Sequence, residues 1–308
     1  MGDGGTGYNV YLAEDGKSVL LRQAGKDILY VVTTPKLSTD QNGNAWTAAE
    51  NGKYLVGAVD KLAENLSLAV DTNVDVVDAY DGKTSLREAI AYATELGGGS
   101  VTFSKDVDWG TLGSVIVLDE TLGELTIEKS ISIDGSLGDA GKITIKVKTS
   151  VYDKVKAYCT EKGIAESDFT YADTMALDMT GVSTHRIFHV TGDYLTFTLA
   201  NMELQGGNVT GDGAVIRTPP VVSGVVANTI LNITNVDILG GRSSGWGGLV
   251  YAAHANSAKF DNVTLAYGFG SVGGAAYIKN LTMTDSVVRN NYSNDQTAGL
   301  RVVGSSTI

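Results

Sequence analysis

One strand pattern occurs four times in the C-terminal half of the chain, as LANMEL (199–204), ITNVDI (233–238), FDNVTL (260–265) and MTDSVV (283–288). The Asn or Asp at its third position recurs after 34, 27 and 23 residues. Apolar and polar residues alternate around it, as in a strand that buries one face. Self-similarity at such a spacing indicates a solenoid, in which each turn packs on its neighbours.

A second pattern lies between the copies of the first, as GAVI (213–216), GLVY (248–251), GAAY (274–277) and GLRV (299–302). Two strands per period, out of phase, predict a coil. We therefore expect an all-β chain that forms a right-handed parallel β-helix, whose turns stack about 4.8 Å apart around a continuous apolar interior. The repeated Asn should occupy a bend, because Asn tolerates left-handed backbone and can hydrogen-bond its equivalent on the next turn.

The N-terminal part differs from these repeats, and we predict a cap over residues 1–99 that combines strands with two helices. Short apolar runs at 8–12, 19–21 and 28–32 alternate with turn residues and predict strands. Leu55, Val59, Leu62 and Leu66 recur at helical spacing and predict a helix over 53–67.

The second cap helix has clearer boundaries. Ser85 followed by Glu88 is typical of a capping box, and Gly97-Gly98-Gly99 should end the helix. The β-helix is then expected over 100–308, interrupted by a charged, helix-like insertion at 150–168. Because the last residues, 302–308, stop within a strand-like pattern, we expect that the chain is truncated in the middle of a coil.

The composition argues against nucleic-acid binding, membrane insertion and internal disulfides. The 308 residues carry a formal net charge of −12, which opposes binding to nucleic acid. No apolar run approaches eighteen residues, so we expect no membrane insertion of this segment. Cys159 is the single cysteine, which excludes an internal disulfide framework.

A family resemblance rests on four stretches. Thr84-Ser85-Leu86-Arg87-Glu88-Ala89-Ile90 resembles the CSLREA-type entry motif of bacterial surface β-helix proteins, with Thr84 in place of the cysteine. Arg186–Val190 is similar to the first complete coils of that group. Gly273–Tyr277 and Val287–Asn290 look like the GGAI and FxxN repeats of polymorphic outer-membrane proteins and autotransporter passengers, with Val287 in place of the phenylalanine. The resemblance covers residues 74–308.

The resemblance implies a secreted or cell-surface bacterial protein, attached to the outer membrane as part of a longer chain. We expect an adhesin or passenger module that binds a host or bacterial surface glycan or protein without catalysis. Two alternatives stay open: a polysaccharide lyase or glycoside hydrolase built on the same coil, and a structural, self-associating fibre segment.

An enzyme of this kind would need clustered carboxylates, either to bind Ca²⁺ or to exchange protons. The carboxylates in question belong to turns or to the repeat itself, so we assign no catalytic residue. His185 and His189 lie four apart, about 13 Å along a strand, which is too far to share a metal. We expect no metal site and no cofactor, with Ca²⁺ left open. The candidates weighed are Asp134, Asp212, Asp237, Asp261 and Asp285, with Arg217, Arg242, Arg289 and Arg301.

Aromatic residues offer the best binding surface. Tyr251 and Tyr277 hold equivalent places in adjacent coils, and an outward-facing ladder of rings could stack on sugars or grip a protein. Two registers remain open: the tyrosines face solvent if Val250 and Ala276 are interior, and they are core if Leu300 and Val302 set the register. The candidate ligand-binding residues are Trp246, Tyr251, His254, Tyr267 and Tyr277.

Overall fold

The structure, a computed structural model, describes residues 8–12, 19–23, 29–32, 67–78, 81–219 and 228–308. The chain divides into two compact units, one of Met1–Glu64 with Ala79–Gly82 and one of Asn65–Asp78 with Lys83–Ile308.

The first unit holds an antiparallel sheet in the order β1 (Tyr8–Leu12), β2 (Val19–Gln23) and β3 (Leu29–Val32). These strands confirm the three predicted near the N-terminus. The helix predicted over 53–67 lies outside the described residues except for residue 67.

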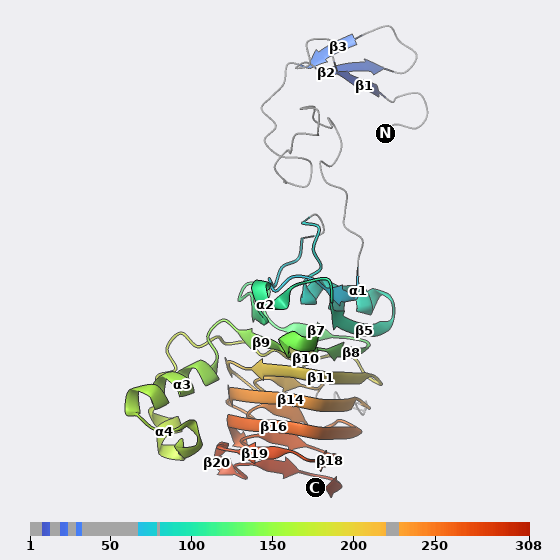
Figure 1. The fold of residues 1–308 in the computed structure, drawn as a ribbon. Helices are drawn as coiled ribbons and strands as arrows, with labels where there is room; N and C mark the ends of the chain where they lie inside the picture. Colours follow the sequence, from blue (N-terminus) through green and yellow to red (C-terminus); the bar gives the residue numbers. More distant parts are fainter. Residues whose placement is uncertain (1–7, 13–18, 24–28, 33–66, 79–80, 220–227) are drawn as a thin grey trace. The chain divides into compact units, whose positions relative to one another are not determined.

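The second unit is mostly β, and its named strands pair in parallel in two sheets. Along the chain, strands of one sheet alternate with strands of the other, so that strands distant in sequence lie side by side within each sheet (Figure 1). The six-stranded sheet has the order β21 (Leu300–Val302), β17 (Ala276–Ile278), β15 (Val250–Ala252), β13 (Ile216–Arg217), β10 (Phe188–Val190) and β7 (Leu125–Ile127).

The other sheet, called here the large sheet, is thirteen-stranded. Its main order is β22 (Ser306–Thr307), β18 (Leu281–Thr284), β16 (Ser257–Val272), β14 (Ile230–Ser243), β11 (Thr196–Gln205), β8 (Ser130–Asp134), β5 (Gly98–Phe103) and β4 (Ala69–Val70). Five shorter strands pair with these or with one another: β6 (Val115–Leu118), β9 (Ile143–Val147), β12 (Asn208–Val209), β19 (Val287–Arg289) and β20 (Tyr292–Gln296).

Helix α1 (Leu86–Glu95) precedes β5, and its N-terminus has the predicted capping box. The Ser85 hydroxyl accepts from the Glu88 backbone N–H, while the Glu88 carboxylate accepts from the Ser85 N–H. The helix buries Leu86, Ala89, Ile90 and Ala93 in the main core. A short helix, α2 (Trp109–Leu112), follows β5.

The long strands of the large sheet bend at the repeated Asn. Asn201, Asn235 and Asn262 have φ values of 55°, 56° and 52°, and Asp285 follows with 49°. Each amide donates to the preceding turn: Asn235 Nδ2 lies 2.7 Å from Asn201 Oδ1, and Asn262 Nδ2 lies 3.0 Å from Asn235 Oδ1. Asn201 donates in turn to Asp134 Oδ1 at 2.8 Å. The predicted Asn ladder is confirmed.

The second repeat is shifted from the alignment expected from the sequence. Gly213, Gly247 and Gly273 occupy the left-handed position, with φ between 61° and 66°, and Thr297 follows with 56°. Strand register places Ile216 beside Val250 and Ala276 beside Leu300. The alignment of GAVI and GLRV with GLVY and GAAY is therefore wrong by one residue, because either glycine of the Gly-Gly pairs at 247–248 and 273–274 can match and only the first adopts positive φ.

One apolar core extends through the second unit, built from alternate residues of both sheets. β9 shows the pattern directly, because Ile143, Ile145 and Val147 are fully buried and the residues between them are not. Phe188 and Phe197 meet edge to face across the core, with ring centroids 5.2 Å apart. Side chains repeated in register thus fill a continuous interior.

The predicted insertion at 150–168 contains α3 (Val151–Lys162) and a 3₁₀ turn at Glu166–Asp168, followed by α4 (Tyr171–Ala176). Another 3₁₀ turn, Gly138–Ala140, precedes β9. Figure 1 shows α3 and α4 beside the stacked strands. They form a second, smaller core in which Val155, Cys159 and Phe169 meet Leu239, Ala266 and Tyr267 of the large sheet.

The Asn ladder can be tested by two substitutions at the same residue. Asn235→Gly keeps the left-handed bend and loses only side-chain hydrogen bonds, which should cost about 1 kcal/mol. Asn235→Ala also forces a Cβ into the left-handed region, for roughly 1–2 kcal/mol more. The urea midpoint should therefore fall in the order wild type, Gly variant, Ala variant, and equal midpoints for the two variants would contradict the role assigned to the bend.

Candidate functional site

One residue from each strand of the six-stranded sheet points away from the core, and we call this set the outer row. Its register is given by the strand pairing, which places Tyr251 between Arg217 and Tyr277. The neighbours of these residues along each strand face the core: Val250 and Ala276 are fully buried, and Leu300 and Val302 are partly buried against the core. At about 4.8 Å per strand, the row is about 24 Å long. Its members are Thr126, His189, Arg217, Tyr251, Tyr277 and Arg301.

This register resolves the two possibilities left by the sequence. Leu300 lies beside Ala276 and therefore continues the interior row, while Arg301 lies beside Tyr277 on the outside. The tyrosines belong to the outer face. Tyr277 is partly exposed, whereas Tyr251 is only 4% exposed because neighbouring groups cover it on that face.

Four of the five candidate ligand-binding residues come together here as an aromatic cluster, defined as Trp246, Tyr251, His254 and Tyr277. The Trp246 ring stacks on Tyr277, with centroids 4.9 Å apart and planes at 15°. The centroid of the Tyr251 ring lies 6.0 Å from that of Tyr277 and 6.3 Å from that of His254. Trp246 remains 44% exposed. Its backbone N–H donates to Asp212 Oδ1 at 2.8 Å.

Burial sets the protonation of this cluster. Burial, followed by the charge of Asp212, raises the pKa of Tyr251 to about 12, so the phenol stays protonated at neutral pH. Burial and the nearby Lys279 charge lower the pKa of His254, which favours the neutral imidazole. The cluster therefore presents uncharged aromatic groups.

Tyr267, the fifth candidate, lies elsewhere. It is 3% exposed and belongs to the core beneath the helical insertion, where its ring stacks on Tyr152 at 5.4 Å. Its hydroxyl donates to the Glu166 carbonyl and accepts from Arg289. Tyr267 thus anchors the insertion on the large sheet.

Farther along the outer row, His189 belongs to a polar group with Glu124 and Arg186. His189 Nδ1 is 2.7 Å from Glu124 Oε1, and Arg186 binds Glu124 Oε2 at 2.5 Å. Burial raises the pKa of Glu124, but the hydrogen bond from His189 and the charge of Arg186 outweigh it and hold that pKa below its ordinary value. Glu124 is therefore a carboxylate near neutral pH and orients the His189 ring.

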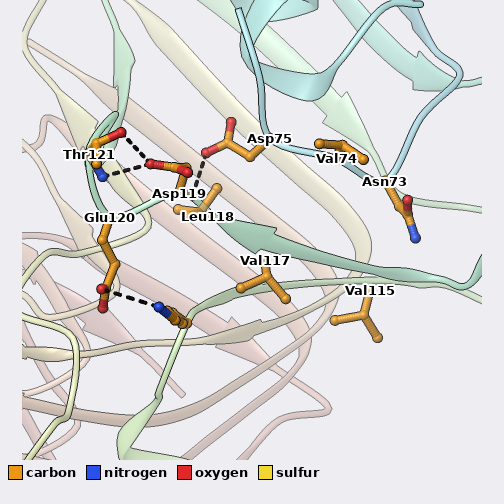
Figure 2. A pocket seen from close by; sticks show the side chains of 10 residues that line it. Asn73, Val74, Asp75, Val115, Val117, Leu118, Asp119, Glu120 and Thr121 are labelled. Carbon is orange, nitrogen blue, oxygen red and sulfur yellow. Dashed lines mark hydrogen bonds and ion pairs between the residues drawn. The ribbon is translucent and has the colours of Figure 1, made fainter.

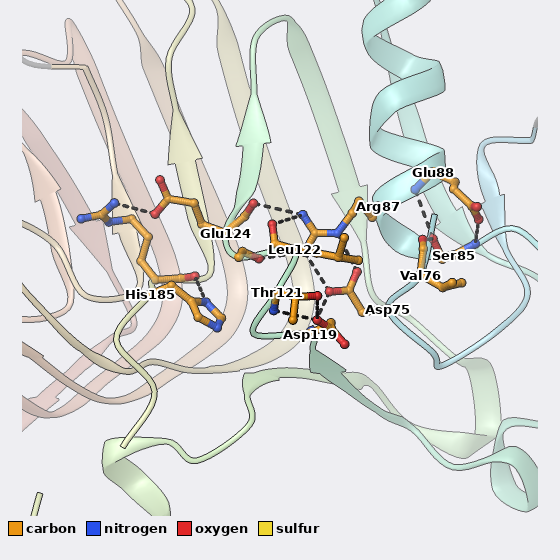
Figure 3. Close-up of polar contacts among 12 residues, drawn as sticks. Asp75, Val76, Ser85, Arg87, Glu88, Asp119, Thr121, Leu122, Glu124 and His185 are labelled. Atoms are coloured by element: carbon orange, nitrogen blue, oxygen red, sulfur yellow. Dashed lines mark hydrogen bonds and ion pairs between the residues drawn. The ribbon is translucent and has the colours of Figure 1, made fainter. Parts of the chain in front are cut away.

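Arg87 of the TSLREAI stretch organises the end of the unit near α1 (Figure 3). Its guanidinium binds both oxygens of Asp75 at 2.8 Å. It also donates to three consecutive backbone carbonyls, those of Leu122, Gly123 and Glu124. Because the Asp75 side chain is 1% exposed, this is a buried, bidentate ion pair that ties the entry helix to the turn before β7.

A shallow pocket of about 550 Å³ lies nearby, lined by Val74, Val115 and Val117 and by three acidic residues (Figure 2). All three acids are engaged: Asp75 with Arg87, Asp119 with Thr121, and Glu120 with Lys148 and Ser183. Hydrogen bonds from Thr121 lower the pKa of Asp119. Each acidic side chain of the pocket therefore already has a partner within the fold.

The carboxylates weighed from the sequence are dispersed in structural roles. Asp134 caps the Asn ladder and Asp212 holds Trp246, as described above. Asp237 pairs with Lys142 at 2.5 Å, and Asp261 accepts from Thr284. In the described part of the chain, no group of three or more His, Cys, Asp and Glu side chains could hold a metal ion. No described helix is long and apolar enough to cross a membrane.

Sequence reasoning missed the pairing of Glu124 with Arg186 and His189, and the partners of Arg87. Glu124 lies 65 residues before His189, and only the register of β7 with β10 brings them together. The Arg186–Val190 stretch did contain two of these residues, but nothing local identified the partner.

Comparison with known proteins gave no further guide: no family model matches the chain, and no curated protein or solved structure matches it.

Arg87→Ala should be strongly destabilising, because it leaves the buried Asp75 carboxylate without its counter-charge, at a cost of about 3–5 kcal/mol. Arg87→Lys keeps a charge but not the fork that reaches Asp75 and the carbonyls, so an intermediate loss is expected. Urea unfolding measures both, with the exposed Lys105→Ala as control. A wild-type midpoint for Arg87→Ala would contradict the structural role of the ion pair.

Glu124 should contribute a pH-dependent share of stability. Its pKa is lowered by folding, so its stabilisation is present above the ordinary glutamate pKa and is lost as the pH falls through the lowered value. Glu124→Gln should therefore lower the free energy of unfolding by about 1–3 kcal/mol at pH 7, and the two proteins should converge in acid. The exposed Glu128→Gln is the control, and a constant difference across pH would refute the assignment.

Proposed function

We propose that the second unit is a right-handed parallel β-helix. Three observations support this: the strands pair in parallel, the chain alternates between the two sheets, and the bends stack in register through the Asn and Gly positions. Crossovers between parallel strands of one sheet are right-handed in about 98% of cases. The pitch of such a coil fixes the spacing of the outer row.

We further propose that this β-helix is a binding module of a secreted or surface-attached bacterial protein and that it contacts a glycan or protein partner. The location rests on the resemblance of residues 84–90 to an entry motif of surface β-helix proteins. The observation that carries the binding role is Trp246, which is 44% exposed while Tyr277 covers one of its faces.

The aromatic cluster suits a carbohydrate in particular. A ring held flat by a second ring loses little freedom when a sugar stacks on its exposed face, and the neighbouring Tyr251 hydroxyl stays protonated as a donor. The pre-formed stack therefore reduces the entropic cost of binding.

A catalytic role has one observation in its favour, the Glu124–His189 pair. In the neutral tautomer whose Nδ1–H donates to Glu124, Nε2 is an acceptor, which is the arrangement of an oriented general base. A polysaccharide lyase or hydrolase would then release unsaturated products or new reducing ends, and His189→Ala would abolish them. Sustained turnover of any polysaccharide would replace the binding role with this one.

The binding role is tested with Trp246→Ala against Tyr171→Ala, a control residue that is also 44% exposed but lies in α4. We expect Trp246→Ala to weaken glycan binding about tenfold, as stacking on an exposed ring predicts, and to abolish the ligand-induced change in tryptophan fluorescence. Tyr171→Ala should bind as wild type.

Equal binding by both variants, or failure of wild type to bind any glycan or surface protein on an array, would refute the proposal. A fibre role would instead give concentration-dependent assembly in sedimentation, without dependence on Trp246.

A further inference from the structure

The outer row carries two arginines that differ from the other arginines of the second unit. Arg87, Arg186 and Arg289 donate to side chains or carbonyls, and Arg242 lies over the Phe269 ring at 4.6 Å. Arg217 and Arg301 have neither a hydrogen-bond partner nor an ion pair nor a ring among the described residues. Both belong to the six-stranded sheet, on the same face.

Arg217 is the more informative of the two. Its Nε atom is buried without a partner, although its side chain is partly exposed. A buried donor left unpaired costs free energy unless a ligand or water satisfies it. The planar guanidinium fork is suited to carboxylate or sulfate oxygens, which it can bind through two parallel hydrogen bonds.

The neighbouring acids do not compete for this arginine. Glu124 is held by Arg186 and His189, and Asp212 accepts from the Trp246 backbone. Lys279 adds a third cation close enough to His254 to lower the pKa of that imidazole. A chain with a net charge of −12 thus presents a local group of cations around its aromatic cluster.

We propose that the outer row binds an extended acidic polysaccharide, one that carries carboxylate or sulfate groups, laid along the row across the strands. Sugar rings stack on Trp246 at the centre, while anionic groups reach Arg217 on one side and Arg301 on the other. Three strand steps separate the two arginines, about 14 Å at 4.8 Å per step. A ligand must therefore be several sugar residues long to engage both.

This inference rests on the proposed function and adds the charge and the length of the ligand. It is tested by calorimetry with oligogalacturonates of increasing length, their methyl esters, in which the charge is removed, and sulfated glycosaminoglycan oligosaccharides. We expect the acidic oligomers to bind at least tenfold more tightly than the esters. Affinity should rise with length until both arginines are engaged and then level off.

Arg217→Gln and Arg301→Gln should each weaken binding of the acidic oligomers about tenfold, the change expected for one charge-assisted hydrogen bond. Both should leave binding of the methyl esters nearly unchanged. Lys259→Gln, an exposed residue of the large sheet, makes the same change in net charge and should have no effect. Because neither arginine has a partner among the residues that the structure describes, neither substitution should lower the urea midpoint.

The outcomes separate the two proposals. Preference for galacturonate or for the sulfated oligomer identifies the source of the anion, and either one supports the inference. Equal affinity for acid and ester, with no effect of Arg217→Gln, overturns the inference while Trp246-dependent binding remains. Equal losses with Lys259→Gln would show a non-specific charge effect and overturn it too. Absence of binding to every glycan overturns the inference, and absence of binding to every surface protein as well refutes the proposed function.

Discussion

The left-handed backbone at the bends is the constraint on which the rest of the second unit depends. A long strand such as β16 can pass from one side of the stack to another only if Asn262 adopts positive φ, and its neighbours in the stack must bend at the same level. Asn meets both needs at once, because it tolerates that backbone and its amide donates to the Asn of the preceding strand in the stack. The ladder thereby fixes the register of every strand that it joins.

The large sheet has a second set of bends, at which the residues with left-handed backbone differ from strand to strand. Gly240, Tyr267 and Asn290 stack at this level, with φ values of 61°, 61° and 49°. Tyrosine in this conformation costs roughly 1–2 kcal/mol. The aromatic contacts of the Tyr267 ring offset a free-energy cost of that size. The ring stacks on Tyr152 and meets Phe169 edge to face, with centroids 6.0 Å apart. The helical insertion and the strained tyrosine therefore stabilise each other, which explains why Tyr267 is unavailable to a ligand.

The sequence predicted what is periodic and local. The Asn positions, the capping box at Ser85 and the insertion follow from patterns within a few residues. The register of the six-stranded sheet was less certain, because Gly247-Gly248 and Gly273-Gly274 each allow two alignments. Only the backbone shows that the first glycine of each pair takes positive φ. With that register known, alternation would have placed Tyr251 and Tyr277 outside at once.

The same reasoning explains why the Glu124 network and the unpaired arginines could not be found in advance. A pair separated by 65 residues depends on the accumulated register of the turns between, and the length of each turn varies. Within the stack, however, an outward position repeats at a fixed spacing that the core determines, whatever side chain occupies it. Arg217, Tyr251, Tyr277 and Arg301 can differ in chemistry because none of them belongs to the main core. The core therefore places no demand on the chemistry of the outer row, and the even spacing of its positions across the strands is the feature that a linear polymer, as proposed above, could follow.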